Sequence, residues 1–174
     1  MRNPLIITIG REYGSGGRQI GELVAKTLGI AYYDKKLITL AAQKSGLSDE
    51  FIANNEQRVR NGFMQNLAAS AAYSSGFFSS QYLPLSESIF ISEAQVIRDI
   101  AAKESAVIVG RCADYILRDR KDCLHVFICS DMASRARRIV ERYGQTQKAP
   151  EKRLAEKDQK RKVYYKNYTG RVWG

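Results

Sequence analysis

The chain has 174 residues, of which 44% are hydrophobic and 26% charged, and this composition fits one compact domain of ordinary soluble type. No apolar run reaches the roughly 20 residues of a membrane span. The three cysteines lack the CxxC spacing of a zinc site, and their odd number argues against a disulfide framework, so we expect a cytoplasmic protein. The formal net charge is +10, with nearly all of the excess beyond residue 100, which fits nucleic acid, an anionic membrane surface or a polyanionic small ligand such as a nucleoside triphosphate.

The first predicted strand covers residues 5–9, a short β-branched apolar run that ends at Gly10. After Gly17 the apolar residues recur at helical spacing, and Gly29 is well placed to end that helix. The sequence IAYYD then predicts a second strand, which closes at Asp34. Strand, glycine-rich turn, helix and strand form a βαβ unit, and its turn lies at the carboxyl end of the sheet, where α/β proteins bind ligands.

The middle of the chain changes character between residues 35 and 86. Helical segments there are followed by SAAYSSGFFSSQYLPLS, which fits either a mobile flap with aromatic contacts or plain surface packing. Beyond it, the patterns predict a helix over 87–103, strands over 106–109 and 124–129, and a helix over 133–142. This alternation predicts a parallel α/β sheet, in which His125 is expected to be a core residue.

The last predicted helix begins at Pro150, a residue suited to a first helical turn. One face of this helix mixes cations with aromatic residues, and we therefore expect it to close over an anion or to lie in solvent. The residues of that face are Leu154, Lys157 or Asp158, Arg161 and Tyr165.

Residues 10–19, GREYGSGGRQ, form the glycine loop, which has the composition of a phosphate-binding turn. Its glycines at 14, 16 and 17 allow backbone N–H groups to approach an anion, and the following helix adds its positive dipole end. The GxxxxGK[ST] pattern fails because Gly17 and Arg18 occupy the lysine and Ser/Thr positions, and GxGxxG fails at Gln19. Two alternatives stay open: a dinucleotide site with Asp34 as the ribose-binding acid, and a tight turn without a ligand.

Three segments together resemble the cytidylate-kinase-like family, which is related to bacterial cytidylate kinase. They are ITIGREYGSGGRQIGELVAKTLGIAYYD, IVGRCADYILRD and EKDQKRKVYYKNYTGRVWG, in that order. The resemblance implies a three-layer P-loop fold with a parallel sheet flanked by helices and a core of residues 1–34 and 87–142. It also implies a helical monophosphate-binding insert over 35–86 and a lid over 143–170, whereas the final strand and helix of the family are expected to be missing.

The resemblance implies an ATP-dependent nucleoside monophosphate kinase that requires Mg²⁺ and phosphorylates CMP or dCMP. The implied nucleotide-binding residues lie in the glycine loop and on the helix before the lid; they are Gly14, Ser15, Gly16, Gly17, Arg18, Gln19 and Arg138. In the lid, Lys157 and Arg161 resemble the mobile cations that close on the transferring phosphate. Asp158 precedes Arg161 by three residues and is expected to hold its guanidinium.

Arg18 is the first candidate to replace the absent lysine, because a cation at a helix N-terminus is otherwise unfavourable and points to an anion there. Arg11 is a weaker candidate on the same grounds. Arg111 follows a predicted buried strand at the position where the resembling kinases grip the acceptor monophosphate. Asp34 and Asp114 complete the predicted substrate site, although each is also explained as a helix cap or an ion-pair partner.

Two other functions compete with the kinase. One is a nucleotide-binding regulator or sensor with little transferase activity, which the missing lysine favours. The other is a nucleic-acid binder that uses the basic C-terminal part, although the sequence contains no recognisable RNA- or DNA-binding module. No membrane partner and no protein-held metal site are predicted, and the sequence leaves the formation of a homo-oligomer open.

Overall fold

The computed structural model describes residues 4–34, 40, 85–144, 146 and 148–174. The chain divides into one unit of residues 1–34 and 97–174 and a second unit of residues 35–96. The predicted monophosphate-binding insert lies almost entirely outside the described residues. The described elements are β1 (Ile6–Arg11), α1 (Gly17–Leu28), β2 (Ala31–Tyr33), α4 (Leu85–Lys103), β3 (Ala106–Val109), α5 (Ala113–Ile116), β4 (Cys123–Ile128), α6 (Met132–Tyr143) and α7 (Pro150–Thr169).

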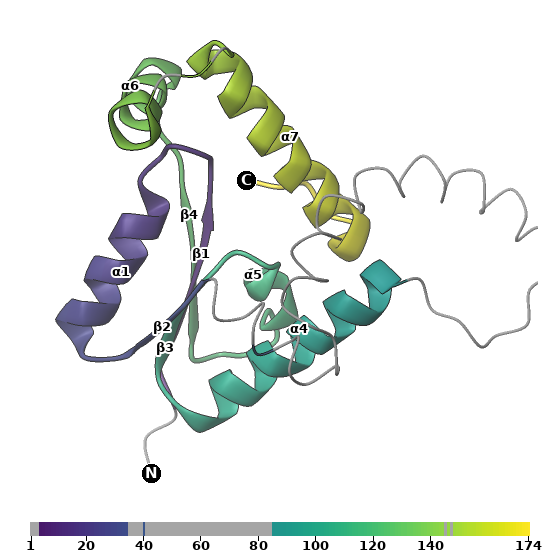
Figure 1. Ribbon diagram of the computed structural model, residues 1–174. Helices are drawn as coiled ribbons and strands as arrows, with labels where there is room; N and C mark the ends of the chain where they lie inside the picture. The colour runs from purple at the N-terminus through teal and green to yellow at the C-terminus, as the bar shows by residue number, and fades with distance from the viewer. Residues whose placement is uncertain (1–3, 35–39, 41–84, 145, 147) are drawn as a thin grey trace, which may run out of the picture. The chain divides into compact units, whose positions relative to one another are not determined.

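The strands form one parallel sheet in the order β2-β3-β1-β4. In its register, Ile7 of β1 is paired with Val107 of β3 on one side and with Leu124 of β4 on the other. Within the first unit, α1 lies on one side of this sheet and α5 on the other (Figure 1). The predicted α/β class, a parallel sheet flanked by helices, is therefore confirmed.

The core follows from the alternation of side chains along β1 and β3. Ile7 and Ile9 pack with Val107, Val109 and Ala25 of α1 on one face of the sheet. The intervening residues of the two strands point to the opposite face and are buried as well; they are Ile6, Thr8, Ala106 and Ile108. Strands buried on both faces are typical of a parallel sheet, and this explains their continuous apolar sequence.

β4 differs from this pattern because it forms an edge of the sheet in the part of the chain that the structure describes. Leu124 is 56% exposed and Phe127 37% exposed. The prediction that His125 is a core residue is wrong: its side chain is exposed, and its Nδ1 lies 2.7 Å from Oγ1 of the buried Thr8. An apolar run predicts a strand here but does not distinguish an edge from a central position.

α6 and α7 lie at the end of the sheet where β1 turns into α1 (Figure 1). α6 begins after Asp131, whose side chain accepts a hydrogen bond from Ser134 N at 2.8 Å, and α7 begins at Pro150 as predicted. Leu154 of α7 packs in a buried cluster with Ala136 and Ile139 of α6. The expectation that this helix stays out of the core is therefore wrong for its N-terminal half.

Within the described residues, no helix has both the length and the apolar character to cross a membrane.

Candidate phosphate-binding site

The glycine loop joins the end of β1 to the first turn of α1. Gly14 and Gly16 adopt left-handed backbone angles, with φ of 78° and 89°, which glycine adopts without strain. Gly16 caps α1 and, as a glycine, offers no side-chain acceptor to the first turn of the helix. The buried Ser15 hydroxyl instead donates to Glu12 O at 2.9 Å. The first-turn N–H groups and the positive dipole end of α1 are thus arranged as in anion-binding loops.

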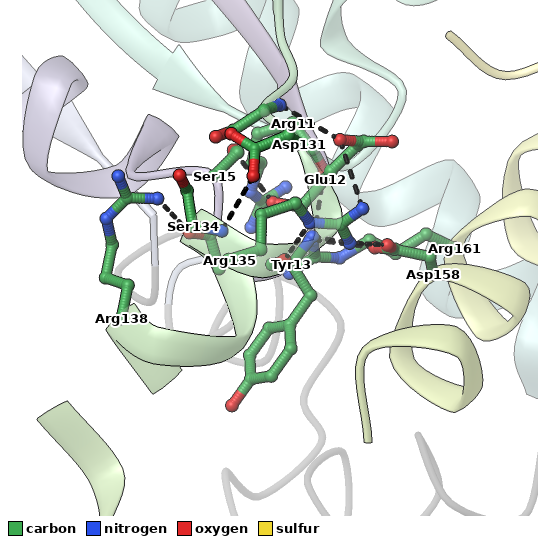
Figure 2. Close-up of polar contacts among 12 residues, drawn as sticks. Arg11, Glu12, Tyr13, Ser15, Asp131, Ser134, Arg135, Arg138, Asp158 and Arg161 are labelled. Atoms are coloured by element: carbon green, nitrogen blue, oxygen red, sulfur yellow. Dashed lines mark hydrogen bonds and ion pairs between the residues drawn. The ribbon is translucent and has the colours of Figure 1, made fainter. Parts of the chain in front are cut away.

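Three arginines from α6 and α7 bind backbone carbonyl groups of the glycine loop (Figure 2). Arg135 Nε donates to Tyr13 O at 2.8 Å, and Arg161 Nη1 donates to Arg11 O at 2.9 Å. Arg138 Nη1 donates to Gly14 O. Because the C=O and N–H of a trans peptide point in opposite directions, these contacts also set the direction of the following N–H groups.

Arg135 and Asp158 form a buried ion pair at the centre of this arrangement (Figure 2). Arg135 is 4% exposed and Asp158 is 7% exposed. Asp158 Oδ1 also accepts a hydrogen bond from Tyr13 N at 2.7 Å, and Arg135 Nη1 lies 3.2 Å from Glu12 Oε2. The pair therefore holds both backbone polar groups of Tyr13, and Arg135 is a structural residue of the loop.

A second group of charges surrounds Arg11 at the carboxyl ends of β1 and β3. Arg11 Nη2 lies 3.8 Å from Asp34 Oδ1, and Arg18 Nε lies 3.1 Å from Asp34 Oδ2. Arg18 also lies 3.4 Å from Glu22 on the next turn of α1. Asp34 thus holds two arginines from opposite ends of the glycine loop.

Burial is the largest cause of the pKa shifts in this group, and neighbouring charges modify it. Burial lowers the pKa of Arg11, and the neighbouring Arg111 and Arg18 lower it further, although Asp34 opposes this change. Burial and Arg11 lower the pKa of Arg161 to about 10. Burial lowers the pKa of Arg18 as well, but Asp34, Tyr32 and Glu22 together outweigh this effect and the net change is upward. A bound polyanion would relieve the repulsion among these arginines.

The backbone at Arg111 is unusual. Gly110, Arg111 and Cys112, which we call the Arg111 loop, all have positive φ, at 82°, 57° and 56°. The Arg111 guanidinium carbon lies 5.9 Å from the centre of the Tyr164 ring. Left-handed conformations in residues other than glycine carry strain, and such strain is concentrated at functional sites.

The structure brings most of the predicted site residues together around the glycine loop. Arg18 and Asp34 are paired, Arg138 and Arg161 contact loop carbonyls, and Arg111 lies close enough to Arg11 to lower its pKa. The expected contact between Asp158 and Arg161 is present at 3.5 Å. Gln19 and Lys157 are exposed on α1 and α7. Asp114 accepts a hydrogen bond from Tyr165 at 2.5 Å.

The sequence did not predict that Arg11 lies at the centre of the second group of charges. It also did not predict the contacts of Arg135, Tyr164 and Tyr165. Arg135 lies one helical turn before the predicted nucleotide-binding residue Arg138 and is buried against Asp158. The pair of tyrosines in KVYYKNY was a visible signal, because two adjacent aromatic residues in a strongly charged helix need contacts to explain them. Nothing in the sequence indicates that Arg135 binds the loop.

The chain is an α/β protein whose first strand leads through a glycine loop to a helix, with arginines gathered around that loop, an arrangement typical of phosphate-binding sites. The chain belongs to the cytidylate kinase-like family, which it matches over residues 6–174. No curated protein matches the chain.

Among solved structures, an uncharacterized protein from Eubacterium ventriosum is similar, with 28% identity and a TM-score of 0.67 over 98% of this chain and 81% of that one. A gluconokinase from Sinorhizobium meliloti has 16% identity and a TM-score of 0.49, over 90% of this chain and 75% of that one. A shikimate kinase from Acinetobacter baumannii, in complex with shikimate, has 15% identity and a TM-score of 0.48, over 94% of this chain and 79% of that one.

Proposed function

We propose that the protein is an ATP-dependent nucleoside monophosphate kinase that converts CMP or dCMP to the diphosphate. The observation that carries the proposal is the group of arginines around the glycine loop, where Arg11 interacts with Arg18, Arg111 and Arg161. Two phosphorylated substrates that meet in one site demand several convergent cations, and family membership gives the reaction its class.

The donor triphosphate is assigned to the glycine loop. Its phosphates would accept hydrogen bonds from the backbone between Gly14 and Gln19 and from the Arg18 guanidinium. Arg138 reaches the same loop through Gly14 O, and its remaining N–H groups would be available to a phosphate oxygen. Arginines held before the substrate arrives would stabilise the developing charge without reorganisation.

The acceptor monophosphate is assigned to Arg111 and Asp34. In the transfer step, an oxygen of the acceptor phosphate forms a bond to the γ-phosphorus, the bond to the bridging β–γ oxygen breaks, and ADP leaves. Arg161 uses one N–H group on Arg11 O, and its other donors would reach the transferring phosphoryl group. Lys157 supplies a second cation on the same helix, in the lid over 143–170.

Mg²⁺ is proposed to enter with the triphosphate. Among the described residues there is no group of three or more histidine, cysteine, aspartate or glutamate side chains that could hold a metal ion. Asp34 is engaged by two arginines, and the Ser15 hydroxyl donates to Glu12 O. These residues do not fit a protein-held metal site, so we assign no chemical step to one.

The test is an assay with MgATP and each nucleoside monophosphate in turn, read as diphosphate formation. CDP or dCDP should form, and both Arg111→Ala and Arg161→Ala should lower kcat/KM by about a hundredfold or more. Arg142→Ala, which removes an exposed arginine of α6, is the matched control and should retain full activity.

The second candidate is a nucleotide-binding regulator, and the observation that favours it is the absence of lysine from the glycine loop. Tight ATP binding without product from any acceptor would support it against the kinase. A nucleic-acid binder would instead show salt-sensitive RNA or DNA binding that ATP does not compete.

A further inference from the structure

α7 reaches the Arg111 loop through two adjacent tyrosines. The Tyr165 hydroxyl donates to Asp114 Oδ2 at 2.5 Å, and the Tyr164 ring lies beside the Arg111 guanidinium, with 5.9 Å from ring centre to guanidinium carbon. One turn earlier, Arg161 donates to Arg11 O in the glycine loop. A single helix therefore contacts both loops at the carboxyl ends of β1 and β3.

The Arg111 loop needs such support. A left-handed conformation is strained for any residue other than glycine, and Arg111 and Cys112 are two such residues in succession. Ala113 N donates to Gly110 O at 3.1 Å, and Ile116 N donates to Cys112 O at 2.9 Å. Asp114 lies in α5, within the turn that these two bonds define, so the bond from Tyr165 holds the helix that directly follows the strained segment.

We propose that Tyr164 and Tyr165 are positioning residues that set the Arg111 guanidinium for the acceptor phosphate. The proposal rests on the proposed function, in which Arg111 binds the monophosphate. Because α7 rises about 1.5 Å per residue, Arg161 and Tyr165 contact the two loops from points about 6 Å apart along one rigid element. α7 would thus fix the separation of donor and acceptor, on which phosphoryl transfer depends. Asp114 is accordingly assigned to this support, in place of the direct substrate contact expected from the sequence.

The test replaces Tyr165 and Tyr164 one at a time. Tyr165→Phe should raise the KM for CMP about tenfold and leave the KM for ATP within about twofold, because the lost hydrogen bond supports only the region around Arg111, where the acceptor is proposed to bind. Tyr33→Phe is the matched control, since the Tyr33 hydroxyl also donates to a carboxylate, Glu104 Oε1 at 2.6 Å, and it should change neither KM. Tyr164→Leu should behave like Tyr165→Phe, whereas Tyr164→Phe keeps the ring and should not.

Amide hydrogen exchange provides a second readout that does not depend on turnover. Tyr165→Phe should speed exchange at Ala113 and Ile116 and leave Gly29, at the end of α1, unchanged. Unchanged loop exchange together with an unchanged KM for CMP would overturn the proposal. An equal rise in both KM values would also overturn it, because it would indicate a general structural effect.

Failure of the proposed function is recognised separately, in the unsubstituted protein. If that protein makes no diphosphate, CMP affinity measured by calorimetry replaces the KM. If it does not bind CMP either, the exchange rates at Ala113 and Ile116 decide alone, with faster exchange in Tyr165→Phe supporting the positioning role and equal rates overturning it.

Discussion

Arg135 and Asp158 are ion-paired in the interior and bind the two backbone polar groups of one residue, Tyr13. Asp158 accepts from Tyr13 N at 2.7 Å, and Arg135 donates to Tyr13 O at 2.8 Å. The pair links α6 and α7 to the glycine loop. α7, which the sequence assigned to the lid, is therefore also part of the support of the loop.

Removal of Asp158 should destabilise the protein strongly. Asp158→Ala leaves the buried Arg135 charge with Glu12 as its remaining acidic partner in the described network, and breaking a buried pair in this way costs about 3–5 kcal/mol. Urea denaturation should show this loss as a lower midpoint at constant slope. Glu156→Ala is the matched control, since Glu156 on the same helix pairs with Lys148 at 2.8 Å in solvent, and its midpoint should not change.

A double replacement separates pairing from packing. Arg135→Met combined with Asp158→Leu removes both buried charges together, so the combined loss should be smaller than the sum of the two single losses. Additive losses would show that the two side chains act independently, contrary to the contacts at Tyr13.

Gly110 should matter for ligand binding more than for stability. A Cβ atom there would lie 1.9 Å from Arg11 Nη1, and the φ of +82° is unfavourable for alanine. Gly29 has a similar φ of +64° but open space around its Cβ position, which makes Gly29→Ala the matched control. Both substitutions should cost about 1–2 kcal/mol of folding free energy from backbone strain.

Only Gly110→Ala should weaken binding of ATP or inorganic triphosphate, by about tenfold, because the Arg11 guanidinium must leave its place beside Asp34. Calorimetric titration of both variants measures the difference. Equal affinities in the two variants would show that the place of Arg11 is unimportant for the ligand.

The sequence predicted the parts of this site that depend on local pattern. The bounds of β3, the start of α1 after the glycine loop and the start of α7 at Pro150 all match, because strand propensity, glycine and proline act within a few residues. The position of Arg111 after a buried strand and a glycine was predicted for the same reason, whereas its role in binding the acceptor is what the family resemblance implies.

The contacts that organise the site could not be predicted in this way. Arg135 and Arg138 lie more than a hundred positions from the carbonyl groups that they bind. α6 contains several arginines, and the sequence does not indicate which of them bind the glycine loop. The mixed face of α7 suggested solvent or a ligand, whereas Leu154 and Asp158 are buried. Burial of a charge is decided by its partner, and Asp158 has partners in both Arg135 and Tyr13.

Arg18 should affect catalysis far more than stability. It is half-exposed and pairs with Asp34 and Glu22 at distances of 3.1 and 3.4 Å. Loss of such surface pairs costs less than about 1 kcal/mol, whereas loss of a cation from the transferring phosphate lowers kcat by about a hundredfold. Arg18→Ala should therefore keep the urea midpoint nearly unchanged while product formation from MgATP and CMP falls. Activity equal to that of Arg142→Ala would exclude Arg18 as the replacement for the lysine.

The pH dependence of nucleotide binding should report on Arg161. Burial, and then Arg11, lower its pKa to about 10 in the folded protein. Below about pH 10 folding therefore carries an unfavourable contribution from the charged Arg161, and this contribution disappears as the pH rises above about 10 toward the higher pKa of the unfolded chain. A bound phosphate favours the charged form and raises the pKa again, so affinity for ATP should fall as the pH rises through about 10.

Calorimetric titrations with ATP at about pH 8, 9, 10 and 11, in the unsubstituted protein and in Arg161→Ala, measure this dependence. Lysines and tyrosines titrate in the same range in both proteins, so the informative quantity is the difference between the two profiles. The affinity of the unsubstituted protein should exceed that of Arg161→Ala at about pH 8 and approach it at about pH 11, where Arg161 has lost most of its charge. A constant ratio of the two affinities across this range would show that the charge of Arg161 does not contact the bound triphosphate.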